Sequence, residues 1–286
     1  MTINTKIKMA IPKGKLQVEI INLLEQVGLT LQSNDRNYRP LCSDPTFEIK
    51  LLKSQNIPKL VELEQHDIGF AGLDWIAEQN ADVEILKSLG FNPVDIVACI
   101  PDDWNYDDLK KRKIIVATEY KTLSTKFLDD EGFDYKLIRS YGATEVFPPE
   151  DADMIIDNTS TGTTILANHL KIVDKVYASN TQFFANKACL KNPSKKAIID
   201  DLLVLMNGVL NGRNRVLLEM NCNQDNVEKI VDLLPAMRSP TISQLYQSQD
   251  FAVRAAVMRN QVKDLIPKLI KAGATDILEI PIRKAI

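Results

Sequence analysis

The stretch DADMIIDNTSTGTTILAN, at positions 151–168, combines residue types that suit a sugar phosphate. The apolar run Met154-Ile155-Ile156 predicts a buried strand, and Asp157 follows it directly. Small hydroxyl residues around one glycine fill positions 158–164, and a helical pattern begins at Ile165. Such a loop presents N–H groups and hydroxyls to a phosphate at a helix start, whereas a carboxylate suits the hydroxyls of a sugar. The pattern therefore indicates a ribose-phosphate site.

The same loop has a plainer interpretation, because Ser- and Thr-rich turns commonly cap helices. It is not a P-loop, since no Gly-Lys-Ser/Thr follows it. A single glycine also cannot form the GxGxxG dinucleotide fingerprint. On these residues alone, helix capping and phosphate binding both remain open.

A second loop, Lys13-Gly14-Lys15, stands between a predicted strand at Lys6–Ala10 and a predicted helix at Leu16–Val27. Two lysines and a glycine before a helix suit a phosphate or a pyrophosphate. A solvated loop without a ligand fits the same residues.

Polar loops of this kind recur along the chain, each after a strand pattern and before a helix pattern. Asp74, Tyr120 and Glu145 stand in three of them, and Asp74 suits either a helix N-cap or a ligand contact. In an open α/β sheet such strand ends converge on one crevice. The other strands are predicted at Phe47–Leu52, His66–Ala71, Val94–Ile100, Lys113–Ala117, Tyr135–Arg139, Ile172–Tyr177 and Thr181–Asn186, and further helices at Ile57–Leu63, Leu123–Glu131 and Ser194–Leu210.

The last part of the chain changes character after a boundary predicted at 211–214. Strand patterns occupy Arg215–Met220, Thr241–Tyr246, Phe251–Met258 and Thr275–Ile282, and helix patterns occupy Asp225–Leu234 and Val262–Ala272. The order βαββαβ is that of a ferredoxin-like module. Such modules often regulate or assemble enzymes.

Composition excludes several classes of protein. The 286 residues are 45% hydrophobic and 26% charged, which is ordinary for two or three globular domains. A net charge of −3 implies no general affinity for nucleic acid. No apolar run is long enough to span a membrane, and the N-terminal residues lack a signal-peptide core, so we expect a cytoplasmic protein.

Cysteine and histidine chemistry is not expected to contribute. The four cysteines are scattered and should be reduced and mostly buried: Cys42, Cys99, Cys189 and Cys222. Two histidines, His66 and His169, argue against a histidine-based zinc site. Catalysis here should rely on positioning, charge and Mg²⁺ rather than on a histidine base.

Seven motifs together resemble ATP phosphoribosyltransferase in its long form, almost end to end. They are AIPKGKL (10–16), DIGFAGLDW (67–75), ATEYKTL (117–123), GATEV (142–146), ADMIIDNTSTGTTILAN (152–168), SPTISQL (239–245) and GATDILEIPI (273–282). Three positions depart from the family pattern, Asn56, Lys121 and His169, where the family usually has Asp, Pro and Gly. The nucleotide contacts expected near Asn56 and Lys121 therefore remain open.

The resemblance implies an α/β fold, with a two-lobed core like that of periplasmic binding proteins and a C-terminal ferredoxin-like regulatory domain. We expect lobe I at 1–93 and 182–213, lobe II at 94–181 and the regulatory domain at 214–286. ATP and phosphoribosyl pyrophosphate are the implied substrates, with Mg²⁺ as cofactor and histidine as feedback inhibitor. Hexamers in exchange with dimers are implied, without a separate regulatory subunit. The main alternative is a two-lobed ligand sensor without chemistry.

In the implied reaction, adenine N1 attacks the anomeric carbon of the ribose and pyrophosphate leaves. We expect Lys13 to stabilise the departing pyrophosphate and Asp157 to hold the ribose hydroxyls near the developing positive charge. Asp153 lies four residues earlier, about 13 Å away along a regular strand, so both carboxylates cannot hold one diol. Asp153 should therefore support the site from further away or serve a metal.

The expected sites can be given residue by residue. The phosphoribosyl pyrophosphate site comprises Asp153, Asp157, Ser160, Thr161, Gly162, Thr163 and Thr164. The ATP site comprises Lys13, Gly14, Asp74, Tyr120 and Glu145. The histidine site comprises Asn221, Met237, Ser239, Thr241 and Ala274. No metal ligand is assigned.

Overall fold

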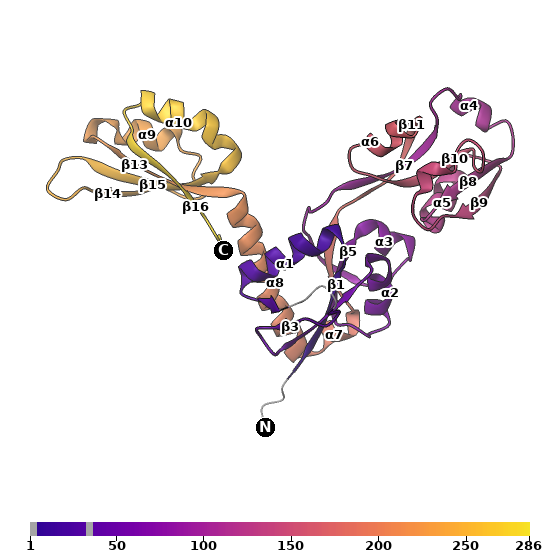
Figure 1. Cartoon of the computed structure of the whole chain (residues 1–286). Helices are drawn as coiled ribbons and strands as arrows, with labels where there is room; N and C mark the ends of the chain where they lie inside the picture. The colour runs from indigo at the N-terminus through magenta and orange to yellow at the C-terminus, as the bar shows by residue number, and fades with distance from the viewer. Residues whose placement is uncertain (1–4, 33–36) are drawn as a thin grey trace. The chain divides into compact units, whose positions relative to one another are not determined.

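The structure is a computed structural model that describes residues 5–32 and 37–286 (Figure 1). The chain divides into two compact units, one comprising Met1–Glu25 and Leu29–Ile198 and the other Gln26–Gly28 and Ile199–Ile286. The first unit contains two mixed five-stranded sheets, and the second contains one four-stranded sheet. The predicted α/β class is confirmed.

The first sheet has the strand order β4-β1-β5-β12-β6. Its strands are β1 (Ile7–Pro12), β4 (Phe47–Leu52), β5 (Ile68–Gly72), β6 (Glu84–Ser88) and β12 (Thr181–Ala185). β1 runs parallel to β4 and β5, whereas β12 runs antiparallel to β5 and β6. β5 and β12 are buried along their whole length, as expected of strands inside a sheet that is covered on both faces.

The second sheet has the order β11-β7-β10-β8-β9. Its strands are β7 (Val94–Pro101), β8 (Ile114–Thr118), β9 (Tyr135–Arg139), β10 (Met154–Thr159) and β11 (Leu170–Ser179). β8 runs parallel to β9 and β10, and β7 runs antiparallel to β10 and β11. The chain passes between the two sheets after β6 and again between β11 and β12, only one residue apart in the second case.

The helices of the first unit are mostly short. They are α1 (Lys15–Val27), α2 (Ile57–Glu62), α3 (Leu73–Glu78), α4 (Tyr106–Leu109), α5 (Lys121–Asp130), α6 (Thr163–Ala167) and α7 (Lys187–Lys191), with single 3₁₀ turns η1 (Ser54–Asn56) and η2 (Thr144–Val146). α1 buries Ile20, Leu23, Leu24 and Val27, which is the helical spacing that its sequence predicts. A two-stranded ladder pairs β2 (Leu31–Gln32) with β3 (Leu41–Cys42).

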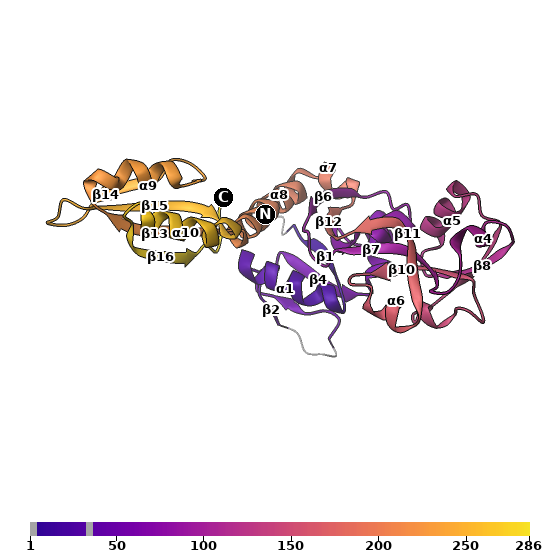
Figure 2. The ribbon, with the colours of Figure 1, turned by 90° about the horizontal axis from the view of Figure 1, so that it is seen from above.

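The C-terminal unit has the predicted order βαββαβ. It consists of β13 (Arg215–Cys222), α9 (Val227–Leu233), β14 (Thr241–Gln244), β15 (Phe251–Met258), α10 (Val262–Lys271) and β16 (Thr275–Pro281), with 3₁₀ turns η3 (Gln224–Asn226) and η4 (Arg259–Gln261). All its ladders are antiparallel, in the order β14-β15-β13-β16. β13, β15 and β16 run alongside one another in both ribbon views (Figures 1 and 2).

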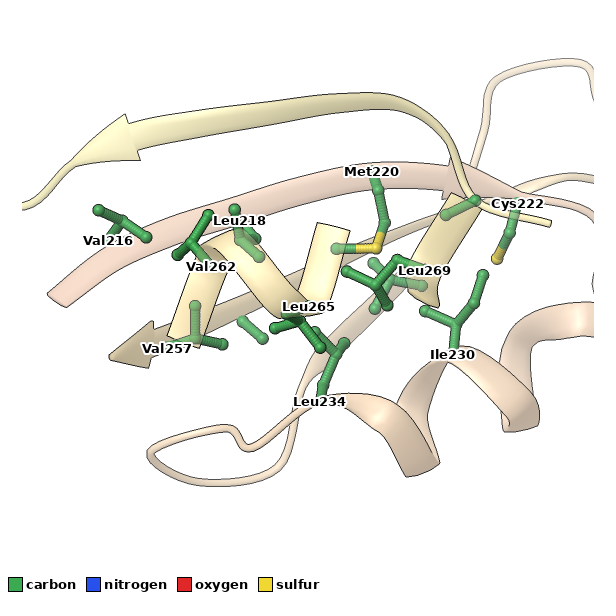
Figure 3. Close-up of a cluster of buried hydrophobic side chains, with 13 residues drawn as sticks. Val216, Leu218, Met220, Cys222, Ile230, Leu234, Val257, Val262, Leu265 and Leu269 are labelled. Atoms are coloured by element: carbon green, nitrogen blue, oxygen red, sulfur yellow. The ribbon is translucent and has the colours of Figure 1, made fainter. Parts of the chain in front are cut away.

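Alternate residues of β13 form the core of this unit. Val216, Leu218, Met220 and Cys222 point to the two helices, whose Ile230, Leu265 and Leu269 are buried against them (Figure 3). The residues between them lie on the other face of the sheet, as a strand with a period of two residues requires.

Several predicted element boundaries are wrong in ways that bear on function. β10 extends to Thr159, so Asp157 lies inside the strand, opposite Val97 of β7, rather than after it. α6 begins at Thr163 instead of Ile165. The loop before Val146 enters only a 3₁₀ turn, because the two prolines that follow it cannot donate the N–H bonds of a helix.

α8 (Pro193–Arg213) runs through most of the boundary predicted at 211–214. At Gly212 the helix backbone lies close to the backbone after β16. An added Cβ would lie 2.9 Å from the carbonyl oxygen of Ile282, so a residue without a side chain suits this position. Among the described residues, no helix is both long and apolar enough to cross a membrane.

Candidate functional site

The first unit contains an open cavity of about 710 Å³. Its wall brings together loops that are distant in sequence, including the predicted site residues Asp74, Tyr120, Glu145, Asp157, Ser160, Thr161, Thr163 and Thr164. Both sheets contribute, because Asp74 follows β5 of the first sheet, whereas Asp157 lies in β10 and Tyr120 follows β8 of the second. The convergence of strand ends expected from the sequence is therefore present.

The hydroxyl loop leaves β10 at Thr159 and turns sharply at Gly162. Gly162 has a φ of +74°, in the left-handed region that favours glycine. Its N–H donates to Thr159 Oγ1 (2.9 Å), and the hydroxyls of Thr161 and Thr163 lie 2.9 Å apart. Gly162 is absent from the cavity wall, so its contribution is to the backbone of the loop.

Asp157 is the carboxylate that this loop carries into the cavity. Its Oδ1 accepts from the backbone N–H of Asn158 (2.7 Å) and from Asn158 Nδ2 (3.1 Å), and the Thr144 hydroxyl also bonds to the carboxylate. Burial raises the pKa of Asp157; the hydrogen bonds oppose this shift, and the charges of Glu119 and Glu145 add to it. The protein thus holds a partly desolvated acid in a fixed orientation, as expected of a group that must act on a ligand.

Asp74 and Tyr120 line the cavity but already have partners in the protein. Asp74 Oδ2 accepts from the Tyr120 hydroxyl (2.9 Å), and Asp74 Oδ1 accepts from the Ser179 hydroxyl (2.7 Å). Tyr120 is 1% exposed and stacks on Trp75, with ring centroids 4.8 Å apart. Burial and the neighbouring Asp74 charge raise the pKa of Tyr120. Asp74 is not an N-cap, since Gly72 occupies that position of α3.

Besides Gly162, three residues predicted for the substrate sites do not line the cavity. Lys13 places its Nζ 4.1 Å from the centre of the Tyr38 ring, and Gly14 adopts a φ of +93° beside it. Lys15, which was not assigned, lines the cavity instead. Asp153 accepts from Arg112 Nη2 (2.6 Å) and lies just before β10, at the end of the strand away from the hydroxyl loop.

Several cavity residues escaped the sequence analysis. Asn158 lies in the hydroxyl loop, and its amide side chain, which can both donate and accept hydrogen bonds, could have marked it as a site residue. Ser54, Asn92 and Ser179 had no such signal, because they lie in a 3₁₀ turn and in the two crossings between the sheets. Of the three departures from the family pattern, His169 has a φ of +55°, which explains why glycine suits that position.

The residues expected to bind histidine form two groups in the C-terminal unit. Asn221 pairs with Thr275 in the ladder, next to the buried Ala274, and its Nδ2 donates to Asp276 Oδ2 (3.0 Å). Met237, Ser239 and Thr241 lie in or before β14, where Thr241 pairs with Arg254. Met237 N–H donates to the carbonyl of Ala256 (3.0 Å).

Comparison with known proteins identifies the class. Residues 53–208 match the family model described as ATP phosphoribosyltransferase, and residues 212–284 match the one described as HisG, C-terminal domain. Proteins named ATP phosphoribosyltransferase from Pelotomaculum thermopropionicum and Desulforudis audaxviator are 39% and 38% identical, each over 98% of this chain and 99% of their own.

A solved structure has the same fold. It is titled "ATP phosphoribosyl transferase (HisG:HisZ) complex from Thermotoga maritima" and superposes with a TM-score of 0.62 at 21% identity, covering 70% of this chain and 98% of that chain. The cavity, the mixed sheets and these matches define an enzyme of the glycosyltransferase type. The chain belongs to the ATP phosphoribosyltransferase family, and the resemblance found in its motifs is confirmed. The reaction of this family is the first step of histidine biosynthesis.

Proposed function

We propose that this chain transfers the phosphoribosyl group of phosphoribosyl pyrophosphate to N1 of ATP. The observation that supports this most directly is the juxtaposition, in one cavity, of the Asp157 carboxylate and the hydroxyls of Ser160, Thr161, Thr163 and Thr164. A carboxylate recognises the ribose hydroxyls, and the loop hydroxyls recognise the phosphate on the same sugar.

The chemistry requires no nucleophile from the protein. The N1 lone pair of adenine forms the new bond to the anomeric carbon while the bond from that carbon to the pyrophosphate oxygen breaks. Positive charge develops on the ribose, and Asp157 is suited to stabilise it. Lys15 is better suited than Lys13 to receive the departing pyrophosphate, because Lys15 lines the cavity and the Lys13 ammonium lies over Tyr38.

Magnesium is proposed to enter with the substrate. Among residues 5–32 and 37–286, no group of three or more His, Cys, Asp and Glu side chains could hold a metal ion. Mg²⁺ commonly keeps several waters and binds through substrate phosphates rather than in a cage of protein ligands. When bound there, it neutralises charge on the leaving pyrophosphate, and no residue of this chain is assigned to it.

ATP is proposed to occupy the remainder of the cavity. Trp75 offers an aromatic surface there, and Glu145 lies on the wall beside the second sheet. Asp74 and Tyr120 form part of the wall rather than direct contacts to ATP, since the Tyr120 hydroxyl already donates to the Asp74 carboxylate.

The first experiment is turnover by the purified, folded chain. ATP, phosphoribosyl pyrophosphate and Mg²⁺ are mixed, and the adduct is measured by its ultraviolet absorbance. Absence of turnover, with both substrates still bound, would favour a sensor. Asp157→Asn serves as the matched control, because it keeps the size of the side chain and removes its charge.

Regulation is proposed to reside in the C-terminal unit, through histidine bound between copies of the chain in a hexamer. The two groups around Asn221 and Met237–Thr241 are the proposed contacts, and β14 is an exposed edge strand that a neighbouring copy could approach. A chain ended after Gly212 should remain active without responding to histidine, and should no longer form the hexamer. Full inhibition of that truncated chain by histidine would place the inhibitor site elsewhere.

Thr241→Ala supplies a finer test of the same site. It should weaken inhibition by histidine while leaving the KM of both substrates nearly unchanged, because Thr241 lies in the C-terminal unit. Unchanged inhibition would remove Thr241 from the proposed histidine site.

A further inference from the structure

Asp157 is connected through hydrogen bonds to a buried carboxylate in the first turn of α3, just after strand β5 of the other sheet. Asn158 Nδ2 donates to Tyr120 Oη (3.1 Å) and to Asp157 Oδ1 (3.1 Å). The Tyr120 hydroxyl donates to Asp74 Oδ2 (2.9 Å). We propose that Asp74, Tyr120 and Asn158 form a positioning relay that orients Asp157 toward the ribose of the substrate. This inference rests on the function proposed for Asp157.

The carboxylate of Asp74 fixes the direction of every bond in the relay. An ionised carboxylate can only accept, so the single hydroxyl hydrogen of Tyr120 is committed to Asp74. The oxygen of Tyr120 is then left as an acceptor, and it selects the NH₂ group of Asn158 rather than its carbonyl oxygen. The second hydrogen of that NH₂ group points to Asp157 Oδ1.

The reverse orientation of Asn158 would be unfavourable. Its carbonyl oxygen would then face both the Tyr120 oxygen and the Asp157 carboxylate, with no hydrogen between them. Asp74 therefore acts on Asp157 at a distance of two side chains. The relay explains why the cavity wall contains the buried carboxylate of Asp74, although this carboxylate need not contact the substrate.

The surroundings hold the first part of the relay rigidly. Ser179 donates to Asp74 Oδ1 (2.7 Å) and accepts from the Asp74 N–H (3.0 Å). Since Tyr120 donates to Oδ2, both carboxylate oxygens accept a hydrogen bond. A Cβ on Gly72 would overlap Asp74 Oδ1, which shows how little room the carboxylate has. The Tyr120 ring is fixed by its stack on Trp75. Buried polar groups that are fully satisfied in this way specify a single geometry.

The groups that face Asp157 come from several elements. Asn158 and Thr144 donate to it, whereas Glu119 and Glu145 oppose its charge. The Cys99 thiol and the Tyr120 phenol also face it; burial is the main cause that raises the pKa of each, to about 12 for Cys99, and the Asp157 charge adds to both shifts. Since acidic neighbours surround Asp157, loss of the Asn158 donor should make its ionised form less favourable.

The test is a double-mutant cycle on Tyr120→Phe and Asn158→Ala. Tyr120→Phe keeps the ring and its stack but removes the acceptor that orients Asn158. Each single variant should lower kcat/KM for phosphoribosyl pyrophosphate about tenfold, the scale of one hydrogen bond to a charged group. Because Tyr120 acts through Asn158, the double variant should lose little more than Asn158→Ala alone.

The pH profile is the second readout. In both single variants the acidic limb of kcat/KM should move to higher pH, because an Asp157 with fewer donors binds its proton more tightly. Tyr106→Phe is the matched control: Tyr106 also contacts an aromatic ring, Phe133, though edge-on rather than stacked, and its buried hydroxyl has no hydrogen-bond partner among the described residues. That control should change neither the rate nor the pH profile.

Two results would overturn the relay. Additive losses in the double variant would show that Tyr120 and Asn158 act independently, and an unmoved acidic limb would show that neither reaches Asp157. Melting temperatures identify any variant that fails to fold, and Asn158→Ala, at an exposed position, keeps the test possible if Tyr120→Phe is unstable. A wild-type chain without turnover would instead refute the proposed function.

Discussion

Gly162 offers a sharp test of the phosphate loop, because its backbone adopts a conformation that a side chain opposes. Its φ is +74°, and an added Cβ would meet only Ile172 Cδ1, at 3.9 Å. Gly162→Ala therefore introduces no clash. The cost comes from the left-handed backbone, about 1–2 kcal/mol for a residue with a Cβ. The loop is short and its neighbours are exposed, so the free protein should relax away from this strain.

Relaxation would break the bond from the Gly162 N–H to Thr159. Part of the binding free energy of phosphoribosyl pyrophosphate is then used to restore the strained conformation of the loop. Its Kd should therefore rise by a factor of roughly 5–30, which corresponds to the same 1–2 kcal/mol. Titration calorimetry with phosphoribosyl pyrophosphate and Mg²⁺ measures this directly, and the fold should survive.

Gly132 provides the matched control. Its φ is +77°, an added Cβ would meet nothing within 4 Å, and it lies outside the cavity wall. The buried Phe133 holds this turn at the end of α5, so Gly132→Ala should keep its strain and melt roughly 2–8 °C lower, at about 2–4 °C per kcal/mol for a unit of this size. Unchanged affinity in Gly162→Ala, or an equal loss of affinity in Gly132→Ala, would refute the proposed role of the loop.

Further predictions concern the carboxylates and the C-terminal unit. Asp157→Asn should lower turnover roughly ten- to hundredfold, the effect of about 1.5–3 kcal/mol, whereas Asp153→Asn should mainly lower the melting temperature; a larger kinetic loss at Asp153 would contradict the geometry. Burial raises the pKa of Asp157, so its contribution to stability is present in acid and lost as pH rises through that pKa. Asp157→Asn should therefore melt no lower than the wild type at pH 7, and calorimetry should show wild-type affinity for phosphoribosyl pyrophosphate falling as pH drops through the same pKa. Gly212→Ala should destabilise by about 1–3 kcal/mol, more than Gly208→Ala, because its Cβ would meet the backbone oxygen of Ile282 at 2.9 Å whereas Gly208 faces a flexible side-chain end; equal melting temperatures would contradict this.

Local patterns were sufficient for most of the elements. The strands at Phe47–Leu52, Tyr135–Arg139 and Phe251–Met258 have the bounds that their residues predict. Each is a short segment in which β-branched or aromatic residues recur among other residues, so the signal lies within the strand itself. The hydroxyl loop was found for the same reason, since its residue types are contiguous.

Elements whose stability comes from distant partners were missed. β6 is mostly exposed and has no continuous apolar run, and it is held in the first sheet by β12, almost one hundred residues later. α7 depends on its cap, where Asn186 accepts from the Cys189 N–H (2.6 Å) and its side chain also donates to the carbonyl of His66 (2.8 Å). Ser179 and Asn92 reach the cavity only because the chain crosses between two sheets beside them.

The two aspartates of the cavity show where residue type ceases to be informative. Asp74, two residues after β5, and Asp157, within β10, both line the same cavity, and each was expected to contact a ligand. Asp74 receives hydroxyl donors on both oxygens from distant residues, and is thereby converted into a fixed acceptor inside the protein. Asp157 is held by its neighbour Asn158 and is opposed by nearby carboxylates, so its charge remains available to a cationic transition state. The partner of each carboxylate, and not its place in a motif, decides which one can serve the substrate.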